Sequence, residues 1–232
     1  MTDLIFPPPA PILVPLRDGS GFYPVTRIFC VGRNYADHAR EMGAEVDREA
    51  PFYFTKSPAH LVLSGTTVPY PPGTKTFHHE MEFVVALGAP GFRVAAEEAM
   101  GLVFGYAAGL DMTRRDLQAE AKDKRRPWDT AKDFENAAVL GPLTRAADFG
   151  LPGPQAITLT LNGEPVQRSH LSEMVWSVPG IIAHLSTLYR LAPGDLIYTG
   201  TPAGVGPVTP GDRLHGEIDG LAPVDLTIAA AE

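Results

Sequence analysis

The sequence is poor in cysteine and in basic residues. Cys30 is the single cysteine among 232 residues, so no intrachain disulfide can form and nothing requires an oxidising compartment. The chain has 19 Lys and Arg against 27 Asp and Glu, which gives a formal net charge of −8. An average field of this sign disfavours a nucleic-acid partner, because a phosphate backbone would be repelled.

A long apolar run is also missing from the start of the chain. Five prolines between positions 7 and 15 interrupt it, which argues against a signal peptide or a membrane span there. We therefore expect a cytoplasmic protein with neither a nucleic-acid nor a membrane partner.

Glycine and proline are abundant instead, with 23 of each scattered as single turn signals. This spacing is typical of many short strands joined by tight turns. We predict an α+β fold with mainly antiparallel and mixed sheets that curl, and a few short helices. The Pro-rich residues 1–27 are expected to form an arm or opening strand pair packed on the main body, and 28–232 the main domain.

Apolar runs and capping residues predict the individual elements. The expected helices are 34–42, with Asn34 as N-cap and Asp37 in the first turn, then 113–126 and 178–188, with a helical turn at 97–100. The expected strands are 27–32, 52–55, 61–63, 81–87, 102–110, 157–161, 196–199 and 213–218.

An acidic pair provides the strongest functional signal. Glu80 and Glu82 are two residues apart in an apolar strand and therefore project from one face, where they would repel each other unless a cation lies between them. Asp111 offers a third carboxylate at the end of another apolar strand, and oxygen-only ligands suit Mg²⁺ or Mn²⁺. A solvated strand face is the alternative. A zinc site on His78 or His79 is another, although adjacent strand residues point to opposite faces.

Other candidates surround this motif. His38 and Glu41 lie three apart on one side of the predicted helix, where they could activate water or form a mere surface contact. The basic stretch 114–126 is compatible with a solvated helix or with a segment that closes over an anionic substrate. Lys132 and Arg33 are candidates for contacts with substrate oxygens, and the glycine-rich residues 199–206 could offer backbone N–H groups to a carboxylate.

Together, several segments resemble the fumarylacetoacetate hydrolase family, in register from about Ile28 to the C-terminus. The segments that carry the resemblance are 31–38 (VGRNYADH), 79–82 (HEME), 105–106 (GY), 111–118 (DMTRRDLQ), 131–134 (AKDF), 162–164 (NGE) and 198–207 (YTGTPAGVGP).

The resemblance implies a mixed β-roll fold that is usually dimeric. It implies Mg²⁺ or Mn²⁺ at Glu80, Glu82 and Asp111, catalytic roles for His38, Glu41 and Lys132, and substrate contacts by Arg33, Gln118 and Thr201.

The activity that the resemblance implies is hydrolysis of a C–C bond in a 2,4-dioxo acid, with fumarylpyruvate as the best guess, in the catabolism of aromatic compounds. The products would be pyruvate and a carboxylic acid such as fumarate. One alternative is oxaloacetate decarboxylation or keto–enol isomerisation at the same site. A non-catalytic protein that binds a metal or an oxo acid is a further alternative.

Overall fold

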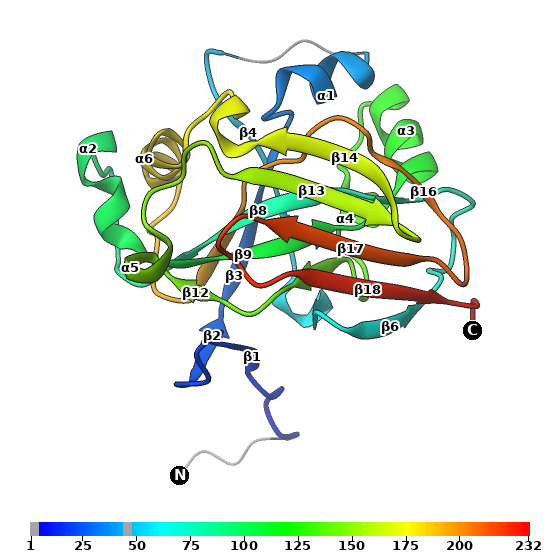
Figure 1. The fold of residues 1–232 in the computed structure, drawn as a ribbon, viewed down its shortest axis with the longest axis horizontal. Coiled ribbons are helices and arrows are strands. Elements are labelled where there is room, and N and C mark those ends of the chain that lie inside the picture. Colours follow the sequence, from blue (N-terminus) through cyan, green and yellow to red (C-terminus); the bar gives the residue numbers. More distant parts are fainter. Residues whose placement is uncertain (1–4, 44–47) are drawn as a thin grey trace.

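The computed structural model describes residues 5–43 and 48–232. Two large mixed sheets face each other across the main core (Figure 1). The first has eight strands: β4 (Phe52–Lys56), β3 (Arg27–Gly32), β15 (Asp195–Tyr198), β8 (Met81–Leu87), β9 (Val103–Asp111), β11 (Ala138–Leu140), β5 (Leu61–Leu63) and β12 (Thr144–Arg145), which pairs with β9. The pairs β3–β15 and β5–β11 are parallel and the others are antiparallel.

The second large sheet has five strands in the order β14 (Glu164–His170), β13 (Ala156–Leu161), β17 (Arg213–Ile218), β18 (Val224–Ala229) and β6 (Thr66–Pro69). Figure 1 shows β13 and β17 of this sheet lying in front of β8 and β9. A three-stranded sheet of β10 (Thr113–Arg114), β7 (Phe77–His79) and β16 (Gly206–Val208) completes the main body. A separate antiparallel hairpin is formed by β1 (Ile12–Pro15) and β2 (Phe22–Val25).

The helices are short and lie around the sheets. They are α1 (Ala36–Glu41), α2 (Ala96–Ala99), α3 (Arg115–Asp123), α4 (Asp129–Lys132), α5 (Ala146–Phe149) and α6 (Val178–Leu188), with 3₁₀ turns η1 (Pro58–His60), η2 (Met100–Leu102) and η3 (Leu171–Glu173). None of the helices in the described ranges has the length and apolar character needed to cross a bilayer. The predicted α+β class with mixed sheets is confirmed.

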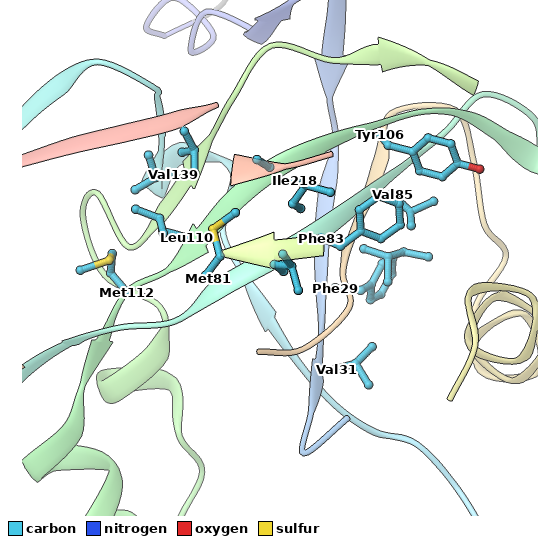
Figure 2. Close-up of a cluster of buried hydrophobic side chains, with 14 of the residues drawn as sticks. Phe29, Val31, Met81, Phe83, Val85, Tyr106, Leu110, Met112, Val139 and Ile218 are labelled. Carbon is cyan, nitrogen blue, oxygen red and sulfur yellow. The ribbon is translucent and has the colours of Figure 1, made fainter. Parts of the chain in front are cut away.

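Strand β8 is buried on both faces, which explains its nearly continuous apolar sequence. Met81, Phe83 and Val85 point into the main core between the large sheets, as Figure 2 shows. Val84 and Ala86 point the other way, into a second cluster that the β1–β2 hairpin covers. Since side chains alternate along a strand, Glu82 lies on the same face as Val84.

The hairpin is tied to the back of the eight-stranded sheet. The Tyr23 hydroxyl donates to the carbonyl of Leu87 at 2.7 Å, and Val14 is fully buried in the second cluster. The predicted opening strand pair is therefore present. The division at residue 27 into an arm and a main domain stays a prediction, and the arm's first four residues lie outside the described ones.

Two local predictions were wrong. The N-cap of α1 is Tyr35 and not Asn34, because the Asn34 amide donates to the carbonyls of Thr199 and Trp176 at 2.8 and 3.0 Å. The predicted helix 113–126 is shorter, since Thr113 pairs with His78 in a strand and α3 begins at Arg115.

Candidate active site

Strand register brings the three acids together. Glu82 pairs with Gly109 across the β8–β9 ladder, and the Asp111 amide donates to the Glu80 carbonyl at 2.9 Å. Glu80 therefore lies opposite Asp111, and Glu82 lies diagonally across. One carboxylate oxygen from each acid lies within 4.8 Å of the others, and all three side chains are buried. The predicted convergence of the acids is present.

Three cations balance part of this buried negative charge. Lys132 Nζ donates to Glu80 Oε2 at 2.8 Å, to Asp111 Oδ2 at 2.7 Å and to the hydroxyl of Thr113 at 2.7 Å. Lys56 Nζ lies 2.8 Å from Asp111 Oδ1, and Arg115 pairs with Glu80. Glu82 has no cationic partner among the described residues and accepts a hydrogen bond from the Gly200 amide at 2.8 Å.

The surroundings shift the pKa values of Glu80 and Glu82 in opposite directions. Burial by itself would raise the pKa of Glu80, but the charges of Lys132 and Arg115 outweigh it and lower that pKa. Burial raises the pKa of Glu82 well above its usual value, and repulsion from Asp111 and Glu80 adds to the rise. Glu82 is thus the acid whose negative charge is least compensated by neighbouring cations.

The donor set fits a hard divalent cation. All three groups are carboxylates, which Mg²⁺ and Mn²⁺ prefer over nitrogen or sulfur ligands. Asp111 Oδ1 is buried and, although it forms an ion pair with Lys56, it accepts no hydrogen bond from any described residue. Within the described ranges, Glu80, Glu82 and Asp111 form the one group of three or more potential ligands that converges. The zinc alternative loses support, because His79 contacts Gln167 and His78 contacts Arg115.

The His38–Glu41 pair lies on α1. His38 Nδ1 lies 3.3 Å from Glu41 Oε2, and both Glu41 oxygens accept from the Gly204 amide at 3.1 Å. Burial lowers the pKa of His38, while Glu80 and Glu41 oppose that change. The imidazole is therefore biased toward the neutral form that can accept a proton.

One cavity joins these groups to the predicted substrate contacts. Its lining includes His38, Glu80, Glu82 and Lys132 together with Arg33, Gln118 and Thr201. Gln118 Oε1 accepts from Arg115 at 2.6 Å, and the Thr201 hydroxyl accepts from Gln167 at 2.9 Å. The structure thus brings these predicted residues to one cavity, and Glu41 and Asp111 contact His38 and Lys132 of its lining.

Two residues of this site escaped sequence reasoning. Lys56 ends an ordinary apolar strand, and only its complete burial beside Asp111 reveals its role. Gln167 is remote in sequence, yet its Oε1 accepts from the Met81 amide at 3.0 Å and its Nε2 donates to the Pro202 carbonyl at 2.8 Å. A lysine inside an apolar strand was a weak signal for the first, and no local pattern signals the second.

Residues 27–229 match the family model described as fumarylacetoacetate (FAA) hydrolase C-terminal, so the chain belongs to the fumarylacetoacetate hydrolase family. It is 54% identical to a fumarylpyruvate hydrolase of Ralstonia sp. over 194 residues, covering 82% of this chain and 100% of the relative.

Two further relatives bear on the chemistry. The crystal structure of a fumarylpyruvate hydrolase from Pseudomonas aeruginosa, in complex with Mn²⁺ and pyruvate, superposes with a TM-score of 0.95 at 43% identity and covers 98% of this chain and 100% of that one. A mitochondrial oxaloacetate tautomerase of Mus musculus is 40% identical over 207 residues, covering 88% of this chain and 92% of the relative.

Proposed function

We propose that this protein is a metal-dependent hydrolase that cleaves the C–C bond of an acylpyruvate, with fumarylpyruvate as the best candidate, into pyruvate and a carboxylic acid such as fumarate. The observation that carries the proposal is a single cavity that joins three buried carboxylates to a His–Glu pair and a buried lysine. The similarity to two fumarylpyruvate hydrolases supports the choice of substrate.

Glu80, Glu82 and Asp111 would hold the Mg²⁺ or Mn²⁺. The cation, when bound, supplies a Lewis acid that polarises the oxo acid and stabilises developing negative charge. The nearby ammonium of Lys132 adds positive charge at the same end of the cavity. Burial alone would lower the pKa of Lys132, but Asp111 and Glu80 raise it and keep the side chain charged.

His38 and Glu41 would activate the water. Glu41 holds Nδ1 of the ring, so Nε2 is the nitrogen left to accept a proton from water. The resulting hydroxide attacks the acyl carbonyl carbon, and the bond from that carbon to the neighbouring methylene breaks. The electron pair leaves with the pyruvate enolate, which takes up a proton at the methylene carbon, so that one water is consumed overall. Arg33, Gln118 and Thr201 would orient the oxo acid.

The direct test is loss of the dioxo-acid absorbance with fumarylpyruvate as substrate. We expect turnover with Mg²⁺ or Mn²⁺, loss of turnover after chelation, and recovery when the metal is restored. Turnover that persists in a verified metal-free sample would exclude the Lewis-acid role.

A variant tests the assigned base. His38→Ala should lower kcat by roughly 10²- to 10⁴-fold, the usual contribution of a general base, while Mn²⁺ binding measured by calorimetry stays near the wild-type value. A kcat close to that of the wild type would place the base elsewhere.

A second candidate function is oxaloacetate tautomerisation or decarboxylation, which the similarity to the Mus musculus tautomerase favours. Neither reaction consumes a hydrolytic water. Glu41→Gln should therefore reduce acylpyruvate hydrolysis more than either oxaloacetate reaction. Equal losses would favour the second candidate.

We also propose, from the family resemblance, a homodimer in the cytoplasm with a small oxo acid as its partner and a role in aromatic catabolism. Light scattering coupled to size-exclusion chromatography measures the assembly directly, and a monomer across micromolar concentrations would exclude the dimer.

A further inference from the structure

Two positive side chains in the cavity have no negative partner. Arg115 and Lys132 line the cavity and are neutralised by Glu80 and Asp111. Arg33 and Lys122 line the same cavity, but neither side chain forms an ion pair or hydrogen bond with any residue in the described ranges. One part of the cavity therefore carries excess positive charge.

Lys122 is held in place by an aromatic ring. Its Nζ lies 5.1 Å from the centre of the Trp128 ring, a cation–π distance, and Trp128 also lines the cavity. Burial lowers the pKa of Lys122, and repulsion from Arg115 and Arg33 lowers it further, outweighing the opposite effect of Glu80. An anion bound here would relieve that repulsion.

Arg33 has an unusual backbone conformation, and its side chain is largely exposed at the cavity. Its φ of 57° lies in the left-handed region, which non-glycine residues rarely adopt. The next residue enforces this conformation, since Asn34 is fully buried and accepts from the Trp176 amide at 2.7 Å besides donating to two carbonyls. Backbone strain of this kind concentrates at ligand sites.

The excess charge lies away from the acids. Arg115, Gln118 and Lys122 follow i, i+3, i+7 spacing and share one face of α3. Arg115 contacts Glu80, and Lys122 lies two turns further along, a rise of about 10 Å. The cavity thus has an acidic end that fits a cation and a cationic end that fits an anion.

We propose that Lys122 and Arg33 bind a second carboxylate, at the acyl end of the substrate, and make the enzyme selective for dicarboxylic acylpyruvates. This inference rests on the proposed hydrolysis. An extended dioxo acid whose acyl group ends in a carboxylate has the length and charge to reach from the acidic end to these cations.

The test compares a dicarboxylic substrate with a neutral-acyl one. In Lys122→Met, kcat/KM for fumarylpyruvate should fall roughly 10- to 100-fold, the range for a hydrogen bond to a charged group, mainly through KM. The value for acetylpyruvate, which lacks the second carboxylate, should change less than about twofold. Arg33→Met should lower kcat/KM for both substrates, because Arg33 also helps to orient the oxo acid, and the loss should be larger for fumarylpyruvate.

A matched control variant is available at the C-terminal end of α3. Lys124 is exposed, pairs with Glu120 and does not line the cavity, so Lys124→Met removes one positive charge without touching the site. It should leave both substrates unaffected. Equal losses for both substrates in Lys122→Met, or no loss for either, would overturn the inference.

A binding measurement without turnover tests this inference independently of the proposed function. Calorimetry with the Mn²⁺-loaded protein should show fumarate binding more tightly than the monocarboxylate crotonate, with the difference abolished in Lys122→Met. Absence of acylpyruvate turnover would defeat the proposed function alone. Equal affinities of the wild type for fumarate and crotonate would defeat the inference alone.

Discussion

Gly204 links the proposed water-activating pair to the loop beside the cavity. Its amide donates to both carboxylate oxygens of Glu41, and its φ is +96°. A Cβ at this position would lie 2.0 Å from the carbonyl oxygen of Val166, which is backbone and cannot rotate away. The position therefore requires glycine for two separate reasons, conformation and space.

Gly204→Ala should displace the loop and the Glu41 anchor together. We expect kcat to fall at least about tenfold, as loss of an orienting contact for a general base would produce, with a lower melting temperature. Gly211→Ala is the matched control, because Gly211 has a similar φ of +99° but no atom within 4 Å of its would-be Cβ. The control should lose some stability and keep its activity. If both variants kept wild-type kcat, the Glu41 anchor would not matter for turnover.

At the scale of elements, local patterns predicted the longest helix and eight of the strands. They did not predict β6, β7, β10, β11, β12, β14, β16 or β18. Helix 178–188 and strands 27–32, 61–63, 81–87 and 213–218 have the predicted bounds, since their apolar periodicity agrees with the burial they adopt. The helix at 34–42 was predicted with the wrong N-cap, because the Asn34 amide is taken by carbonyls from two distant loops. Such tertiary competition leaves no trace in the local sequence.

The residues of the site likewise divide into those that local sequence patterns predict and those that they do not. Alternation along one strand predicts that Glu80 and Glu82 share a face, and that prediction follows from local geometry alone. The approach of Lys56 and Gln167 depends on pairing between strands far apart in the chain, which periodicity does not encode. The unpaired charge of Lys122 is likewise visible only once the partners of the neighbouring cations are known.

The β17–β18 ladder contains a pH-dependent pair remote from the cavity. His215 Nδ1 lies 2.7 Å from Asp225 Oδ1 across the two strands, and this hydrogen bond raises the pKa of His215 above its ordinary value. A raised folded-state pKa stabilises the fold fully below the unfolded pKa, and this stabilisation is lost as pH rises through the folded pKa.

His215→Gln should therefore lower the melting temperature more at about pH 5.5 than at about pH 8.5, with a small effect because the ring is half exposed. His170→Gln is the control, because that ring lies 3.6 Å from Glu173, beyond hydrogen-bond distance. A difference between wild type and His215→Gln that is constant with pH, or larger at alkaline pH, would contradict this assignment.

At the scale of the whole molecule, the burial of Glu82 opposes folding unless a cation joins it. The raised pKa of Glu82 means that its ionised form is disfavoured in the folded state, so the apo protein is destabilised near neutral pH. A cation bound only by the native fold reverses this, because it adds about 2.7 kcal/mol at a hundredfold excess over Kd. The same carboxylate should thus destabilise the apo protein and stabilise the metal-loaded one.

Glu82→Gln should change the melting temperature in opposite directions in the apo and the metal-loaded protein. We expect the variant to melt at a higher temperature than the wild type in the presence of a chelator, because a buried charge is removed while an amide of the same shape remains. With saturating Mn²⁺ the order should reverse, because the wild type gains binding free energy that the variant has lost. Differential scanning calorimetry near pH 7.5 under both conditions measures the two orders. A variant less stable than the wild type by the same amount with and without Mn²⁺ would show that Glu82 is a structural hydrogen-bonding residue and not a metal ligand.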